Sequence, residues 1–118
     1  MVLADTSVWI EHFRHGHAGL SARLTEGSVL MHPFVSGELA CGNLKDRSMV
    51  LTQLSSLPAA KLATHVEALQ CIDIHRLWGR GLGWIDMHLL ASALLSECRF
   101  WTLDKKLAQA ADDMRIGR

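Results

Sequence analysis

The sequence predicts an α/β fold in which a central, mostly parallel sheet is covered by helices on both faces. Short apolar runs of strand length alternate along the chain with longer segments of helical periodicity. This alternation is typical of parallel sheets whose strands are connected by helices. The chain has 118 residues and contains no repeat, linker or low-complexity tract. We therefore expect one domain over residues 1–118 with a single core.

The first half of the chain predicts two strands that each lead into helices. Gly27 follows the second helical segment, where a C-terminal stop is expected. Pro33 is well placed to open the helix that follows the second strand. The expected elements are a strand at 2–4, a helix through 8–13, a helix at 18–26, a strand at 28–31, a helix at 33–41 and a helix at 45–57.

The second half contains one helix start that the sequence marks clearly. Thr64 and Glu67 have the spacing of a capping box, in which two side chains satisfy the free amides at a helix N-terminus. The helix that begins there is expected to turn Val66, Leu69 and Ile72 inward. The other expected elements are a weak strand at 59–63, a buried helix at 84–95, a strand at 100–102, a last helix from 103–107 onward and a strand ending at 116.

Composition excludes several classes of protein. Hydrophobic residues make up 49% of the chain, and 12 Lys and Arg balance 12 Asp and Glu, which argues against disorder and against a partner bound by bulk charge. No apolar run reaches the roughly eighteen residues of a membrane span, and the start lacks the basic segment of a signal peptide. The three cysteines are odd in number and far apart, which predicts reduced core thiols. We expect a cytoplasmic protein without a membrane segment.

Four acids fall near expected helix starts, and three of them follow expected strands: Asp5, Glu38, Asp86 and Asp104. Each alone can be explained without function, because acids cap helices and favour the positive end of the helix dipole. Asp86 is harder to explain in this way, because an ionised acid in a buried helix must be paired, capped or bound to a metal.

The carboxyl ends of parallel strands share one edge of a sheet, so the four acids are expected to converge there. Carboxylates held close together repel one another unless a cation neutralises them. One or two carboxylates with water suit Mg²⁺ or Mn²⁺. Such an ion can activate a water molecule and stabilise a phosphate under in-line attack.

The acids stand within longer motifs that resemble a known family. These motifs are VLADTSVWI at 2–10, Glu38-Leu39, GWIDMHLLA at 83–91 and Thr102-Leu103-Asp104. In this order the chain resembles the PIN domain, and within it the VapC-type toxin ribonucleases. The likeness spans almost the whole chain.

The resemblance implies a metal-dependent endoribonuclease that is held inactive by a cognate antitoxin. It implies that Asp5 and Asp86 are the main ligands of Mg²⁺ or Mn²⁺. The catalytic set it implies is Asp5, Glu38, Asp86 and Asp104, with the hydroxyl of Thr6 or Ser7 in support.

An RNA substrate would have to be steered by local cations, since the chain has no net charge. The cations nearest to the expected acidic edge precede the helix of Asp86 or directly follow Asp104. They are Arg76, Arg80, Lys105 and Lys106.

An antitoxin could silence such a site by laying an apolar helix in a groove and directing an Arg toward the carboxylates. We expect the groove between the first helix and the helix after Pro33. The expected lining is Trp9, Phe13 and Leu39, with Leu20 and Leu24 beneath. Because the isolated protein would expose this apolar patch, a homodimer is also expected.

Two other function classes fit part of the pattern. A phosphoacceptor receiver domain also has an acidic pocket on a parallel sheet, but it needs paired acids after the first strand, where only Asp5 is present. A PIN-like module that only binds protein is the second alternative. The four acids argue against it, because a site without catalysis has no physical need to keep mutually repelling charges.

Overall fold

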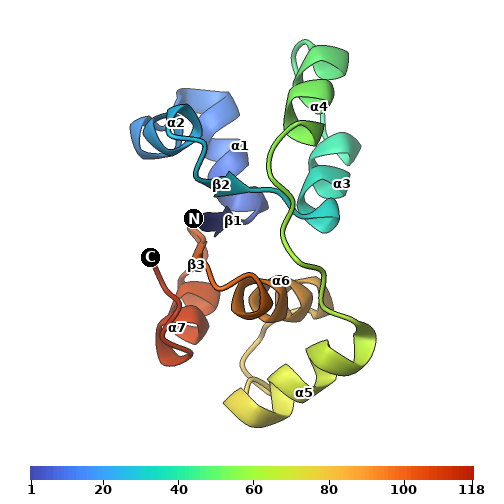
Figure 1. The fold of residues 1–118 in the computed structure, drawn as a ribbon, viewed down its shortest axis with the longest axis vertical. Helices are drawn as coiled ribbons and strands as arrows, with labels where there is room; N and C mark the ends of the chain where they lie inside the picture. The colour runs from blue at the N-terminus through green and yellow to red at the C-terminus, as the bar shows by residue number, and fades with distance from the viewer.

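The computed structural model describes residues 1–118 and contains three strands and seven helices. Its extents are 40 × 24 × 23 Å, and the long axis runs from α4 at one end to α5 at the other (Figure 1). None of the helices is long and apolar enough to cross a membrane. The elements are β1 (Val2–Ala4), α1 (Thr6–His15), α2 (Ala18–Thr25), β2 (Val29–Leu30), α3 (Pro33–Cys41), α4 (Arg47–Ser55), α5 (His65–His75), α6 (Trp84–Leu95), β3 (Arg99–Trp101) and α7 (Lys105–Asp113).

The three strands form one parallel sheet in the order β2-β1-β3. In Figure 1, α1 to α4 lie above the strands and α5 to α7 lie below them. Val2, Leu3 and Ala4 of the central strand are fully buried, and they belong to a single core cluster of 28 residues. The expected α/β class with a parallel sheet between helices is thus confirmed.

Both outer strands carry one further backbone bridge. Met31, just after β2, pairs with Ala59, and Phe100 of β3 pairs with Gly117. The strands expected at 59–63 and before 116 were therefore wrong in extent, since each is reduced to a single parallel bridge. Beyond Ala59 the backbone leaves the sheet because α6 offers other acceptors: Lys61 N donates to Ser96 Oγ at 2.9 Å, and Ala63 N donates to Ser92 Oγ at 3.1 Å.

The capping box at the start of α5 is confirmed. Thr64 Oγ1 accepts a hydrogen bond from Glu67 N at 3.1 Å, and Glu67 Oε1 accepts one from Thr64 N at 2.9 Å. The expected inward face of this helix was wrong for Val66 and Leu69, which are 59% and 45% exposed, whereas Ile72 is partly buried and packs against the core as expected.

The small side chains Ala68 and Cys71 face inward on α5 instead. Small residues let the backbones of α5 and α6 approach closely, and this contact decides the rotation of α5 about its axis. Cys71 and Cys98 are buried free thiols as expected, but Cys41, at the end of α3, is exposed.

A buried histidine connects the end of β2 to α6. His32 caps α3, where its Nδ1 accepts a hydrogen bond from Phe34 N at 3.0 Å, and its Nε2 lies 3.1 Å from Ser92 Oγ. Burial, together with the nearby His88, lowers the pKa of His32 to about 4. The imidazole is therefore neutral at pH 7, and Nδ1 can act as the helix cap.

Candidate active site at the carboxyl edge of the sheet

Asp5 lies where β1 ends and α1 begins, and it caps that helix. Its Oδ1 accepts hydrogen bonds from Ser7 N at 3.0 Å and from the Ser7 hydroxyl. Its Oδ2 accepts one from Thr102 Oγ1 at 2.6 Å, and its backbone N donates to Trp101 O at 2.9 Å. Asp5 is therefore fixed to the neighbouring strand by both its side chain and its backbone.

Asp5 is the most buried of the four acids, with 7% of its surface exposed. Burial raises the pKa of its carboxyl group, while the hydrogen bonds from Ser7 and Thr102 act in the opposite direction. Asp86 is partly buried, and Glu38 and Asp104 are exposed. Asp5 is thus the group whose ionised form would gain most from a nearby cation.

Thr102 is a member of this site that the sequence reasoning did not single out. Besides its bond to Asp5, its Oγ1 accepts a hydrogen bond from Asp104 N at 3.1 Å. Ser7 Oγ makes the matching contact, accepting from Leu103 N at 3.0 Å. The two hydroxyls tie the end of β3 to the end of β1. The sequence analysis placed Thr102 at the end of an expected strand and in the motif Thr102-Leu103-Asp104, but gave this residue no role in the site.

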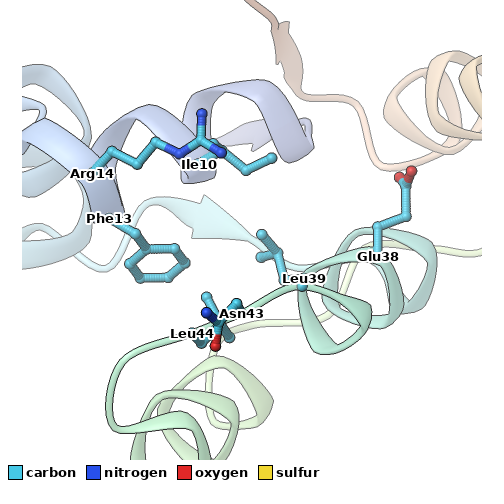
Figure 2. Close-up of a pocket in the computed structure, with 8 residues that line it drawn as sticks. Ile10, Phe13, Arg14, Glu38, Leu39, Asn43 and Leu44 are labelled. Carbon is cyan, nitrogen blue, oxygen red and sulfur yellow. The ribbon is translucent and has the colours of Figure 1, made fainter.

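Glu38 reaches the same edge from α3. Thr6 Oγ1 donates a 2.9 Å hydrogen bond to Glu38 Oε1, which links the first residue of α1 to α3. Figure 2 shows the Glu38 carboxylate pointing away from Phe13 and Leu44. Thr6 and Ser7 therefore contact different acids: Thr6 holds Glu38, and Ser7 holds Asp5.

Asp86 and Asp104 are both engaged at helix N-termini. Asp86 Oδ2 accepts a hydrogen bond from Gly83 N at 3.0 Å, just before α6. Asp104 Oδ1 accepts one from Leu107 N at 3.0 Å and caps α7. Asp104 is connected to Asp5 through Thr102, whereas the hydrogen bond of Asp86 stays within its own helix start.

The donor chemistry of this edge suits a hard cation. No group of three or more His, Cys, Asp or Glu side chains is arranged so that it could hold a metal ion by itself. Mg²⁺ does not require such a group, because it commonly keeps several waters and binds one or two carboxylates together with substrate phosphates. The side-chain atoms of Asp5 and its direct contacts that could ligate a metal are all carboxylate or hydroxyl oxygens. The residues therefore fit an oxygen-liganded divalent ion.

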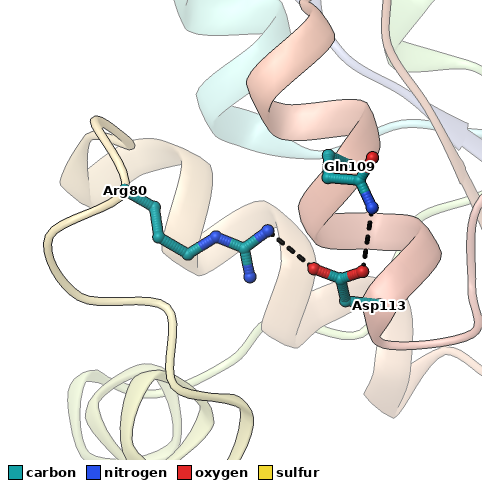
Figure 3. A network of polar contacts seen from close by, with 3 residues as sticks. All are labelled: Arg80, Gln109 and Asp113. Atoms are coloured by element: carbon teal, nitrogen blue, oxygen red, sulfur yellow. Dashed lines mark hydrogen bonds and ion pairs between the residues drawn. The ribbon is translucent and has the colours of Figure 1, made fainter.

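Three of the four expected substrate cations come together around one cavity. Arg80, Lys105 and Lys106 line an open cavity of about 270 Å³ with Gln109. The fourth, Arg76, does not line it; it ends α5 in a left-handed conformation with φ 53°. Arg80 is also held by Asp113, as Figure 3 shows.

An apolar cavity lies between α1 and α3, where a groove was expected. Its volume is about 130 Å³, and Figure 2 shows Phe13 and Leu39 among the side chains around it. Trp9 was wrongly placed in this lining, because it is only 2% exposed and instead borders an adjoining cavity of about 120 Å³ with Phe13 and Leu24. Ile10 takes the place expected for Trp9.

Comparison with known proteins identifies relatives over nearly the full chain. The family model of the PIN domain matches residues 2–113, which span every element from β1 to α7. Two proteins named Ribonuclease VapC32, from Mycobacterium tuberculosis strains CDC 1551 / Oshkosh and ATCC 25618 / H37Rv, are each 47% identical over 117 residues. The aligned region covers 98% of this chain and 94% of each relative.

Proposed function

The chain belongs to the PIN domain family, and on that premise we propose that it is a metal-dependent endoribonuclease and the toxin of a toxin–antitoxin pair. Similarity to ribonucleases over 98% of the chain supports the activity. The observation that carries the proposal is Asp5: a carboxylate 7% exposed, at the carboxyl end of the central strand, with hydroxyl donors on both of its oxygens. A bound cation would stabilise the ionised form of this buried acid and so give a reason for its position.

We assign Asp5 and Asp86 as the main ligands of Mg²⁺ or Mn²⁺, with Glu38 and Asp104 completing the catalytic set. When bound, the ion supplies charge stabilisation to the phosphate and lowers the pKa of an attacking water. Thr102 and Ser7 keep Asp5 in one orientation through their hydrogen bonds. Such fixed positioning matters because small displacements of reacting groups cost large factors in rate.

Glu38 is proposed to accept a proton during the reaction. Thr6 holds Oε1, while Oε2 has no hydrogen-bond partner and the side chain is exposed. Glu38 Oε2 can therefore accept the proton that the attacking water releases, as a general base. Asp104 is held at its backbone by Thr102 and at its side chain by α7, and it adds negative charge that attracts the cation.

RNA is held by the cavity of Arg80, Lys105 and Lys106. A chain with no net charge can still attract RNA, because the positive field of these three side chains at the cavity decides where a phosphate binds. With few phosphate contacts, affinity should fall only shallowly with salt. Arg76 contributes at most to long-range steering.

The antitoxin is proposed to occupy the apolar cavity between α1 and α3. Ile10, Phe13 and Leu39 line it, and Arg14 and Glu38 lie at its border. An apolar helix seated there would place its next residues beside Glu38, where an inserted Arg could pair with the site carboxylates. A homodimer is also proposed, since Ile10 and Phe13 are each 37% exposed.

The deciding experiment is incubation of the purified protein with RNA, with and without Mg²⁺ or Mn²⁺, beside Asp5→Asn. Cleavage only with metal, and only by the parent, supports the proposal. RNA cleavage at the same rate by Asp5→Asn contradicts the site. Antitoxin binding without any cleavage by the parent would instead make the chain a PIN-fold binding module. Membership of the PIN family argues against the receiver alternative.

A further inference from the structure

The cavity lined by Arg80, Lys105, Lys106 and Gln109, here called the cation cavity, is formed by two separate parts of the chain. Arg80 comes from the loop before α6, while Lys105, Lys106 and Gln109 come from α7. No apolar residue lines it. Like charges repel, so three cations around one cavity of about 270 Å³ need a reason to gather in a protein with no net charge. A bound anion is such a reason.

Arg80 is oriented by an acid that does not itself line the cavity. Its Nη2 donates a 2.7 Å hydrogen bond to Asp113 Oδ2, and Gln109 Nε2 donates a 2.9 Å bond to Asp113 Oδ1 (Figure 3). Both carboxylate oxygens of Asp113 are therefore engaged, which fixes the acid in one orientation. The hydrogen bond from Gln109, and then that from Arg80, lower the pKa of Asp113. Asp113 is consequently ionised at pH 7.

The pair leaves most of Arg80 available. A guanidinium carries five N–H donors, and a single one is used by Asp113. The Arg80 side chain is 28% exposed, so its other donors can meet a ligand in the open cavity. Asp113 thus restrains Arg80 without occupying it.

Lys106 is accommodated by a glycine. Gly81 has φ +77°, a conformation that favours glycine, and a Cβ there would lie 3.1 Å from Lys106 Nζ. The ammonium therefore lies against the loop that carries Arg80. Neither Lys105 nor Lys106 has an acid within ion-pair distance. The loop and α7 together bring unneutralised positive charge to one place.

We propose that Arg80, Lys105, Lys106 and Gln109 form a binding site for one backbone phosphate of RNA next to the phosphate that is cleaved, and that Asp113 is the positioning residue for Arg80. The inference rests on the proposed function, because it takes RNA as the ligand. Arg80 lies in the loop that leads into the helix of Asp86, and Lys105 directly follows Asp104. A phosphate in the cavity is therefore held beside the acidic edge, and it sets which bond of the strand reaches the carboxylates.

Removal of the Asp113 charge distinguishes positioning from simple electrostatics. Asp113→Asn deletes a negative charge close to the cavity, so charge alone predicts tighter binding of RNA. Loss of positioning predicts weaker binding, because Arg80 is no longer held in place. Asp112→Asn is the matched control: it removes the same charge from the same helix, at an exposed residue that makes no ion pair.

The measurement is the Kd of a fluorescently labelled single-stranded oligoribonucleotide, with every variant made in the Asp5→Asn background to prevent cleavage. Asp113→Asn should weaken binding by about three- to tenfold, the effect of losing one oriented charge-assisted contact. Asp112→Asn should leave the Kd unchanged or slightly lower. In an Arg80→Ala background, Asp113→Asn should have no further effect, since the residue it positions is gone. Thermal unfolding of each variant checks that the fold is retained.

The outcomes separate the subsite from the nuclease proposal. Equal or tighter binding by Asp113→Asn overturns the subsite, even if the parent cleaves RNA. If the parent cleaves nothing but Asp113→Asn still weakens RNA binding, the subsite stands and the catalytic assignment fails. Absence of RNA binding by the Asp5→Asn protein at low salt overturns the subsite, whereas cleavage by the parent still decides the activity.

Discussion

Thr102 Oγ1 donates a 2.6 Å hydrogen bond to Asp5 Oδ2 and so joins two residues 97 positions apart in the sequence. The bond crosses from the end of β3 to the end of the central strand β1. It holds the buried carboxylate of the proposed metal site in one orientation. Thr102 therefore acts on the site through Asp5, and removal of its hydroxyl should lower both the stability of the fold and the rate of RNA cleavage.

Thr102→Val keeps the shape of the side chain and removes its hydroxyl. Asp5 Oδ2 loses a donor and Asp104 N loses an acceptor, so the free energy of unfolding should fall by about 1–2 kcal/mol. Urea denaturation measures the loss, and RNA cleavage should slow as Asp5 becomes less ordered. Thr52→Val, which removes an exposed hydroxyl on α4, is the control and should change cleavage little. Unchanged cleavage in Thr102→Val would show that the orientation of Asp5 is not important for catalysis.

Asp5→Asn should abolish cleavage without destabilising the fold. Burial raises the pKa of Asp5, so at pH 7 the ionised side chain makes the folded state less stable than a neutral one would. Asn keeps an oxygen for the Ser7 amide and should unfold at an equal or higher urea concentration. The advantage of the variant should shrink as the pH falls and the parent carboxyl takes up its proton. Asp46→Asn, at an exposed helix start without a side-chain cap, is the control; a clearly less stable Asp5→Asn would contradict this account.

Mg²⁺ should stabilise the folded parent protein. An ion that binds only the folded state adds about 1.4 kcal/mol at a free concentration of about ten times its Kd, which is a rise of a few degrees in Tm for a domain of this size. Calorimetry in increasing Mg²⁺, with ionic strength held constant by KCl, measures it. Asp5→Asn should show little of the rise. A flat Tm for the parent at millimolar Mg²⁺ would count against the proposed site.

Stability should fall in mild acid because of His32. The pKa of His32 drops from 6.5 in the unfolded chain to about 4 in the folded protein. The stability that neutral His32 contributes to the folded state is therefore complete above pH 6.5 and is lost as the pH falls toward 4. A pKa difference of about 2.5 corresponds to at most about 3–4 kcal/mol, at about 1.36 kcal/mol for each pKa unit. Protonation of Nδ1 would set two donors, Nδ1 and Phe34 N, against each other.

His32→Asn retains an N-cap residue that does not titrate. Its free energy of unfolding, measured in urea from pH 7 to pH 4, should decline less steeply than that of the parent, whatever its absolute value. His15→Asn is the control, since the His15 side chain is 70% exposed, and it should leave the pH dependence of the free energy of unfolding unchanged. Identical slopes for His32→Asn and the parent would assign the acid sensitivity to other groups.

Phe13→Asp should weaken the antitoxin complex. Phe13 lines the cavity between α1 and α3 and is 37% exposed, so a charge there opposes an apolar helix while the fold can tolerate it. Trp9→Asp is not informative, because Trp9 is 2% exposed and a buried aspartate would unfold the chain. Ile74→Asp, at a 73% exposed site on α5, is the control. Co-expression with the neighbouring small open reading frame and co-purification give the yield; full yield from Phe13→Asp would place the antitoxin elsewhere.

Local rules explain what the sequence could predict. Asp5 and Asp104 were placed at helix starts because acids cap helices, and both are caps in the structure. The Thr64–Glu67 capping box was predicted for the same reason, since its residues are three apart in the chain. Interactions of this kind are encoded within one turn of helix.

Contacts between distant segments could not be predicted in this way. The partner of Asp5, Thr102, follows another strand, and the partner of the loop residue Arg80, Asp113, lies on α7. The inward face of α5 depends on how closely Ala68 and Cys71 let it approach α6, which hydrophobic periodicity alone does not contain. The burial of Trp9 is likewise a consequence of packing between α1 and the segments around it.

The two single bridges at the margins of the sheet limit how copies of this protein can associate. Ala59 pairs with Met31, just after β2, and Gly117 pairs with Phe100 of β3. An unpaired strand would otherwise be a template for another chain, in a functional dimer or in aggregation. Because one residue at each outer edge is already paired within the molecule, extension of the sheet into a second subunit is hindered, and an interface through the helices is favoured. Interface mapping should therefore begin with the exposed apolar side chains of α1 and α5.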